Sequence, residues 1–208
     1  MTGRRFKIVE SVGSRIEDVK CYEDLTKHHP SAGREPNRDY ATINGQLEEV
    51  RHVSGRTLIK KDFVLLVDGS NQSIPVPSPL AGYAKTSRAY GTLKIYDAPT
   101  DGQLIGQILH LHPSFNVNDG DAIAYGQHIG LQAGTDRAGG QSYAIHVHAE
   151  LEEGAFKRYI ADMISGTLNP DELRRSLLDE RKRSKRSGPA ARFRFGWRQL
   201  DLHCGELY

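Results

Sequence analysis

The feature that most constrains the fold is a succession of short apolar stretches separated by turns between about residues 57 and 152. The stretches recur roughly every 8–12 residues, and the turns are rich in Gly, Asp and Asn, a pattern typical of antiparallel sandwiches and barrels. The chain has 21 glycines and 38% hydrophobic residues. We therefore expect a mainly β protein whose core is an antiparallel β-sandwich or barrel.

Individual strands are expected within this region. TLIKKDFVLLVDG (57–69) predicts one strand or a pair of strands, and IPVPSPLAGYAKTS (74–87) predicts an extended segment with prolines that suit a strand end. Alternation of apolar and polar residues predicts further strands in three segments: GTLKIYD (91–97), LIGQILHLH (104–112) and YAIHVHAELE (143–152).

The flanking regions have a different character. Residues 28–40, HHPSAGREPNRDY, contain the prolines and glycine of a loop. AFKRYIADMISG (155–166) has apolar residues at helical spacing and ends in a glycine that suits a C-cap. A second helix is expected after Asn169 as N-cap and Pro170 at the first helical position. We predict three regions: a polar N-terminal extension (1–56), the β core (57–152) and a helical C-terminal extension and tail (153–208).

Charge and cysteine content bear on the class of protein. The net charge of +2 gives no global indication of a nucleic-acid partner, and we expect none. The basic run at 181–186 is interpreted as a solvated helix end or linker, the alternative being a nucleic-acid or membrane-surface patch. Cys21 and Cys204 could pair but form no disulfide framework, and without a CxxC motif no thiolate zinc site is expected.

Targeting signals are also not evident. The first residues, MTGRRFKIVESVG, contain no apolar h-region, so we expect no secretory signal peptide. No apolar run approaches the length of a membrane span. We therefore expect synthesis in the cytoplasm, with any action elsewhere requiring another export route.

The histidines indicate a site with chemistry. Residues i and i+2 of a strand point to the same face, which would pair His146 with His148 and His110 with His112. Imidazole is a common zinc ligand and can transfer protons at neutral pH. Two such pairs in one sheet favour a metal or proton-transfer site over exposed positions without a role.

Several motifs occur in the order and spacing of a known family. They are the His110-Leu111 pair, the Asn116–Ile123 turn, Gly126-Gln127-His128-Ile129-Gly130 and His146-Val147-His148-Ala149-Glu150, with Ser78–Tyr83 and Tyr90–Ile95 upstream. Together they resemble the lysostaphin-type (LytM) zinc metalloendopeptidases over about residues 57 to 152. The resemblance implies the β core of that family, a Zn²⁺ cofactor and a peptidoglycan peptide as substrate.

The resemblance also implies roles for individual residues. The second His of the HxH motif binds zinc in that family and the first acts in catalysis, which makes His148 a metal ligand and His146 a catalytic residue. The second catalytic imidazole would be His110, with His112 as the alternative.

The family's HxGxD motif is incomplete in this chain. Asp62 occupies the position of its aspartate ligand, but Leu58 stands where the motif has histidine. A catalytic zinc needs three protein ligands, so another residue must supply the third. We expect His29, with His28 and His52 as alternatives and with Glu35 and Asp39 as a weaker substitute pair. The opposing interpretation is that the HHP loop is only surface.

Three functions remain open from the sequence. The first is a zinc-dependent endopeptidase that cleaves peptidoglycan cross-links or stem peptides in the periplasm or cell wall. Its export without a signal peptide would suit an antibacterial effector of the type VI kind, with an immunity or secretion-system partner, or release by phage-type lysis. The second is a catalytically degenerate cell-wall binding or activator module, and the third is a phosphocarrier domain of the sugar phosphotransferase type, which needs no metal.

Overall fold

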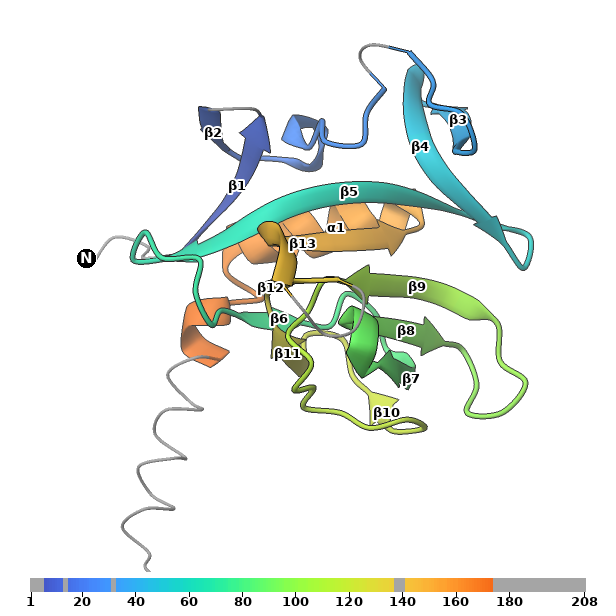
Figure 1. Ribbon diagram of the computed structural model, residues 1–208, viewed down its shortest axis with the longest axis vertical. Helices are drawn as coiled ribbons and strands as arrows, with labels where there is room; N and C mark the ends of the chain where they lie inside the picture. The colour runs from blue at the N-terminus through green and yellow to red at the C-terminus, as the bar shows by residue number, and fades with distance from the viewer. Residues whose placement is uncertain (1–5, 13–14, 31–32, 137–140, 174–208) are drawn as a thin grey trace, which may run out of the picture. The chain divides into compact units, whose positions relative to one another are not determined.

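The structure is a computed structural model that describes residues 6–12, 15–30, 33–136 and 141–173 (Figure 1). The strands are β1 (Phe6–Val12), β2 (Arg15–Asp18), β3 (Asp39–Ile43), β4 (Gln46–Val53), β5 (Arg56–Val67), β6 (Pro75–Pro77), β7 (Gly82–Ser87), β8 (Thr92–Tyr96), β9 (Leu104–Leu109), β10 (Ala122–Ile123), β11 (His128–Leu131), β12 (Ala133–Thr135) and β13 (Gln141–Leu151). The helices are α1 (Glu153–Ser165), the short 3₁₀ helices η1 (Tyr22–Asp24) and η2 (Arg88–Tyr90), and a further helix that begins at Pro170, of which the structure describes residues 170–173.

Antiparallel pairing joins eleven of these strands into one sheet. Its main path runs β10-β7-β8-β9-β13-β5-β1-β2, while β12 pairs with β13, and β4 pairs with both β3 and β5. Strands β6 and β11 form a separate two-stranded sheet. The prediction of a mainly β protein with an antiparallel core is confirmed.

Strands from the first 56 residues belong to this same sheet. Both β1 and β4 pair with β5, through Val9 opposite Val64 and Val50 opposite Ile59. Val9 and Val50 are buried. The segment predicted as a polar extension therefore supplies two neighbours of the long strand β5, and the predicted loop lies between η1 and β3.

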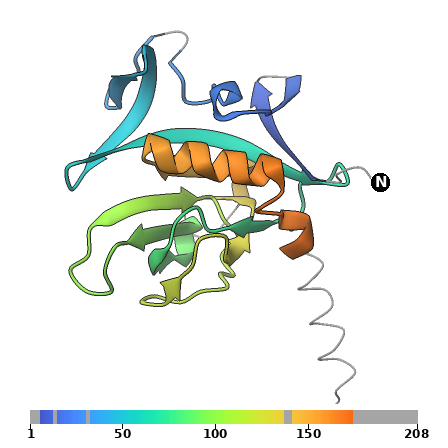
Figure 2. The same cartoon turned by 180° about the vertical axis from the view of Figure 1, so that it is seen from behind.

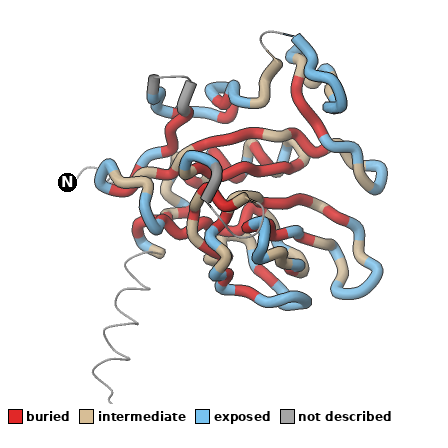
Figure 3. The backbone as a smooth tube through the Cα atoms, viewed as in Figure 1, coloured by how far each residue is buried: buried red, intermediate tan, exposed pale blue. Residues whose placement is uncertain are grey.

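Helix α1 covers one face of β5 (Figure 2). Phe63 of β5 packs against the rings of Phe156 and Tyr159, with ring centroids 6.5 and 6.3 Å apart. The apolar residues predicted for one side of this helix are all buried: Phe156, Tyr159, Ile160 and Met163. Figure 3 shows burial concentrated on β5 and the elements next to it.

Two predicted helix boundaries are confirmed: the end of α1 at Gly166 and the start of the next helix after Asn169. Gly166 follows α1 with a φ of 85°, a left-handed conformation that glycine adopts without steric cost. Asn169 Oδ1 accepts a hydrogen bond from the Asp171 N–H at 3.0 Å, which caps a helix that begins at Pro170. None of the helices in the described part of the chain has the length and apolar character needed to cross a membrane.

Two sequence predictions fall on residues that the structure does not describe. The basic run 181–186 and Cys204 lie after residue 173. Cys21 is exposed and forms no disulfide with any described residue.

Candidate metal centre

The HxH motif lies on β13, between β5 and β9. Pairing places His148 directly opposite Asp62 of β5. Asp62 follows the alternation of its strand, so it points away from the face on which Phe63 meets α1. His148 Nδ1 lies 2.8 Å from Asp62 Oδ1, and both side chains are buried. His146 shares their face, as the i and i+2 spacing predicts, with its Nε2 3.7 Å from Asp62 Oδ2.

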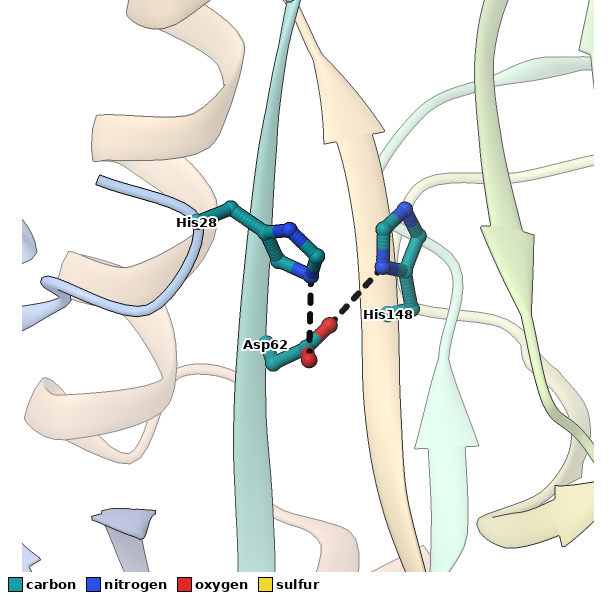
Figure 4. A group of neighbouring side chains, drawn as sticks. All are labelled: His28, Asp62 and His148. Carbon is teal, nitrogen blue, oxygen red and sulfur yellow. Dashed lines mark hydrogen bonds and ion pairs between the residues drawn. The ribbon is translucent and has the colours of Figure 1, made fainter. Parts of the chain in front are cut away.

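A third donor reaches this pair from the loop after η1. His28 Nε2 lies 3.1 Å from Asp62 Oδ2, and the His28 ring centroid is 4.9 Å from that of His148 (Figure 4). One ligand atom from each of His28, Asp62 and His148 lies within 4.8 Å of the others, so the three residues could hold a metal ion. His28 has a φ of 69°, a left-handed conformation that is uncommon outside glycine and that recurs at functional sites.

Each of the two imidazoles has a second carboxylate on its other nitrogen. Glu49 Oε2 lies 3.2 Å from His28 Nδ1, and Glu150 Oε1 lies 3.3 Å from His148 Nε2. A carboxylate that accepts the outer N–H of a histidine fixes the ring and leaves the inner nitrogen for a metal. This arrangement is the usual outer layer of a histidine metal site.

The outer carboxylates are themselves held by cations. Lys60 Nζ and Arg38 each contact Glu49 at 2.8 Å, and Arg51 makes a charged hydrogen bond to Glu150. Burial alone would raise the pKa of Glu150, but His148 and Arg51 lower it to about 2. These carboxylates therefore stay ionised beside the imidazoles at neutral pH.

The pKa values of Asp62 and His148 are also shifted, by burial and by the charged groups around them. Burial opposes the charged form of Asp62, yet its contacts with His148 and His28 hold the pKa of this carboxyl well below its usual range. Burial also disfavours the charged form of His148, but Asp62 and Glu150 raise its pKa to about 9. Lys27 Nζ lies 3.6 Å from Asp62 Oδ2, so cationic groups gather around this one carboxylate.

Two further histidines lie beside the group. The ring centroid of His110 is 4.8 Å from that of His146 and 5.7 Å from that of His148. Nδ1 of His110 donates to the Thr135 carbonyl at 2.8 Å, and Nδ1 of His146 donates to the Ala144 carbonyl at 2.6 Å. Because a carbonyl only accepts, the proton of each neutral ring is on Nδ1, and Nε2 carries a lone pair.

The pKa values of His110 and His146 are both lowered. Burial is the main cause for each, and it outweighs the hydrogen bonds to backbone carbonyls that act in the opposite direction. Both imidazoles are therefore neutral at neutral pH and able to accept a proton at Nε2.

The structure shows which of the candidate third ligands lies at the site. The predicted ligand His29 is not in the group; its N–H closes a turn onto the Thr26 carbonyl at 2.6 Å, and its neighbour His28 points to Asp62 instead. His52 is exposed on β4, with Nδ1 3.2 Å from the Thr57 hydroxyl. The substitute pair does not reach the group either: Glu35 is paired with Arg38.

The prediction of one strand over residues 104–112 is wrong at its end. Strand β9 stops at Leu109, and the next residue, His110, has a φ of 63°. This left-handed residue ends the alternation, so His110 and His112 do not share a strand face. His112 is exposed, and its Nδ1 accepts the Ser114 N–H at 3.2 Å, whereas His110 lies against His146.

Leu58 is a buried apolar residue of β5. It is fully buried opposite Arg51, on the strand face that also carries Asp62. A leucine side chain has no ligand atom, so this position cannot supply the third metal ligand. His28 approaches Asp62 from a different segment and needs no space at that position.

Two residues beside the site, Tyr143 and Glu49, were not predicted from the sequence. Tyr143 is half exposed, and its ring centroid is 4.7 Å from that of His110. Glu49 contacts His28 from β4. Neither has a signal in the sequence, because Tyr143 stands at the wrong spacing for the HxH face and Glu49 is distant from every motif.

Comparison of the sequence with protein-family models and with curated proteins gave no match to either.

Proposed function

We propose that this chain is a zinc-dependent endopeptidase that cleaves cross-links or stem peptides of peptidoglycan. The observation that carries the proposal is the group of His28, Asp62 and His148, with a carboxylate behind each imidazole and two neutral histidines beside it. Two imidazole nitrogens and a carboxylate oxygen form a donor set that zinc prefers. Three protein ligands leave one tetrahedral position open, as a catalytic zinc requires.

The three residues each bring one ligand atom within 4.8 Å of the others, which is close enough to surround a single ion. Zinc–nitrogen and zinc–oxygen distances of about 2.0–2.2 Å in a tetrahedron place the ligand atoms about 3.4 Å apart. Asp62 Oδ1 and Oδ2 lie 2.8 and 3.1 Å from the nearest imidazole nitrogens. In addition, the buried Nε2 atom of His28 faces Asp62 Oδ2 at 3.1 Å.

The neighbouring histidines suit peptide hydrolysis. A zinc ion bound here would lower the pKa of a coordinated water toward about 7 and polarise the peptide carbonyl. His146 has the free Nε2 nearer to Asp62, and that nitrogen can take a proton from the attacking water. The same imidazolium can then deliver the proton to the leaving amine. His110 stands against His146 and supplies a second acceptor nitrogen.

The choice of peptidoglycan rests on the motif resemblance to the lysostaphin-type enzymes. The same holds for action in the periplasm or cell wall and for an immunity or secretion-system partner. The second candidate, a degenerate binding or activator module, is favoured by Leu58, which occupies the family's histidine position. Against it, a half-buried histidine from another segment, His28, meets the same carboxylate.

Metal content is the first test. Elemental analysis of the purified full chain should give about one zinc per chain for the wild type and none for His148→Ala. His112→Ala is the matched control, since this exposed histidine lies outside the group. A wild type that takes up no zinc when zinc is offered would overturn the proposal and leave a binding or carrier module.

Hydrolysis separates the enzyme from a zinc-bearing binding module. His146→Ala should keep its zinc and lose about 10²- to 10⁴-fold in the rate of amine release from purified peptidoglycan, the usual contribution of an acid–base group. Zinc binding by the wild type without any release of new amino groups would support the binding module.

A further inference from the structure

The third donor of the metal group lies on a loop, so its position depends on what holds that loop. The backbone of Glu49 donates to the His28 carbonyl at 3.3 Å, and the Glu49 side chain contacts the His28 ring. These contacts hold the loop on the side of β4. They do not fix the residues immediately before His28.

Glu10 holds the loop from the other side. Its carboxylate accepts hydrogen bonds from the Thr26 N–H at 2.5 Å, from the Thr26 hydroxyl at 2.7 Å and from the Lys27 N–H. Glu10 is only 2% exposed, whereas Thr26 and Lys27 are exposed, so the bonds join the buried sheet to a surface turn. Hydrogen bonds to an ionised acceptor are roughly twice as strong as neutral ones.

The sheet places Glu10 where it can do this. Val9 of β1 lies opposite Val64 of β5, and the two strands are antiparallel. Glu10, the next residue of β1, therefore lies closer to the part of β5 that holds Asp62. A buried carboxylate on the sheet thus reaches over to the turn at Thr26–His29, which the His29 N–H closes onto the Thr26 carbonyl.

We infer that Glu10 is a positioning residue for the metal group: it fixes the turn at residues 26–28 so that His28 reaches Asp62. The inference rests on the proposed function for its metal, but the position of His28 can be measured without one. A buried carboxylate that accepts three bonds from one turn leaves that turn little freedom. Its loss frees the backbone next to the left-handed residue His28.

Glu10→Gln is the test variant, because it keeps the size of the side chain and places an NH₂ group against donors. We expect the zinc dissociation constant of the folded protein to rise about 10- to 100-fold, the range found for outer-shell partners of metal ligands. Competition with a chelator of known affinity measures it. Thr26→Val, which removes one of the three bonds, should give a smaller rise.

Glu48→Gln is the matched control. Glu48 is also a buried sheet carboxylate, but its side chain pairs with Lys61 at 2.7 Å and not with the turn at residues 26–28. It should lower the stability of the fold and leave the zinc dissociation constant unchanged. An equal loss of zinc affinity in Glu48→Gln and Glu10→Gln would show a general effect of destabilisation and overturn the inference.

The second readout is the carbethoxylation rate of His28 in metal-free protein, followed by mass spectrometry. The His28 side chain is only 20% exposed, so it should react slowly in the wild type and Glu48→Gln and several-fold faster in Glu10→Gln. Faster reaction supports the inference even if the wild type binds no zinc, which would defeat only the proposed function. An unchanged rate overturns it.

Discussion

Asp62 is the residue that the imidazoles of the site share. Its Oδ1 meets His148, while its Oδ2 lies 3.1 Å from His28 and 3.7 Å from His146. The side chain is buried, so water cannot replace these partners. If the group holds a cation as proposed, the charge of this one carboxylate faces all of the imidazoles around it.

Asp62→Asn removes that charge while it keeps the shape of the side chain. We expect zinc affinity to fall by more than about 100-fold, because even outer-shell partners contribute 10- to 100-fold. Chelator competition on the folded variant measures the change. Asp101→Asn, at an exposed left-handed turn position, is the control and should bind zinc as the wild type does. Unchanged affinity in Asp62→Asn would contradict the assignment.

The two neighbouring histidines of the HHP loop provide a second test at this scale. His28→Ala should lose zinc and His29→Ala should keep it, because His28, and not His29, belongs to the group with Asp62 and His148. Elemental analysis of both variants distinguishes them. The opposite result would restore His29 as the ligand and mean that the turn at residues 26–29 is arranged differently in solution.

Strand β5 carries core residues on one face and the site carboxylate on the other. Its alternation sends Asp62 to the site and Phe63 to the core under α1. Local pattern was enough to predict β5, β13 and α1, because strand alternation and helical spacing are properties of neighbouring residues. It failed at the end of β9, where one left-handed residue, His110, stops the strand.

A substitution in α1 tests whether the core face of β5 and the site face act independently. Phe156→Ala should lower the free energy of unfolding by about 3–5 kcal/mol, the usual cost of removing a buried aromatic ring. The zinc affinity of the folded fraction should not change. Urea denaturation measures the first and chelator competition the second, with the exposed Ala161→Ser expected within about 0.5 kcal/mol of the wild type. Loss of zinc affinity in Phe156→Ala would show that the two faces are coupled.

At the scale of the whole molecule, the metal group joins three stretches that are far apart in the sequence. His28 belongs to the N-terminal loop, Asp62 to β5 and His148 to β13. An ion held by all three would link the loop to the sheet. It would bind the folded state and lose its site on unfolding.

Zinc should therefore stabilise the fold. At a free zinc concentration about 100 times the dissociation constant, the free energy of unfolding should rise by about 2.7 kcal/mol. Urea denaturation with and without zinc measures this, and Mg²⁺, which prefers oxygen ligands, is the control ion. Equal stabilisation of the wild type and Asp62→Asn by zinc would place the ion elsewhere.

The sequence by itself determined the mainly β class, the strand that carries His146 and His148, and the helix that ends at Gly166. Each follows from periodicity or capping, which depend on residues close in the chain. Only the tertiary structure decided that His28 and not His29 meets Asp62. It alone also placed Glu10 beneath the loop, because a turn's direction and its distant anchors are set by contacts across the sheet.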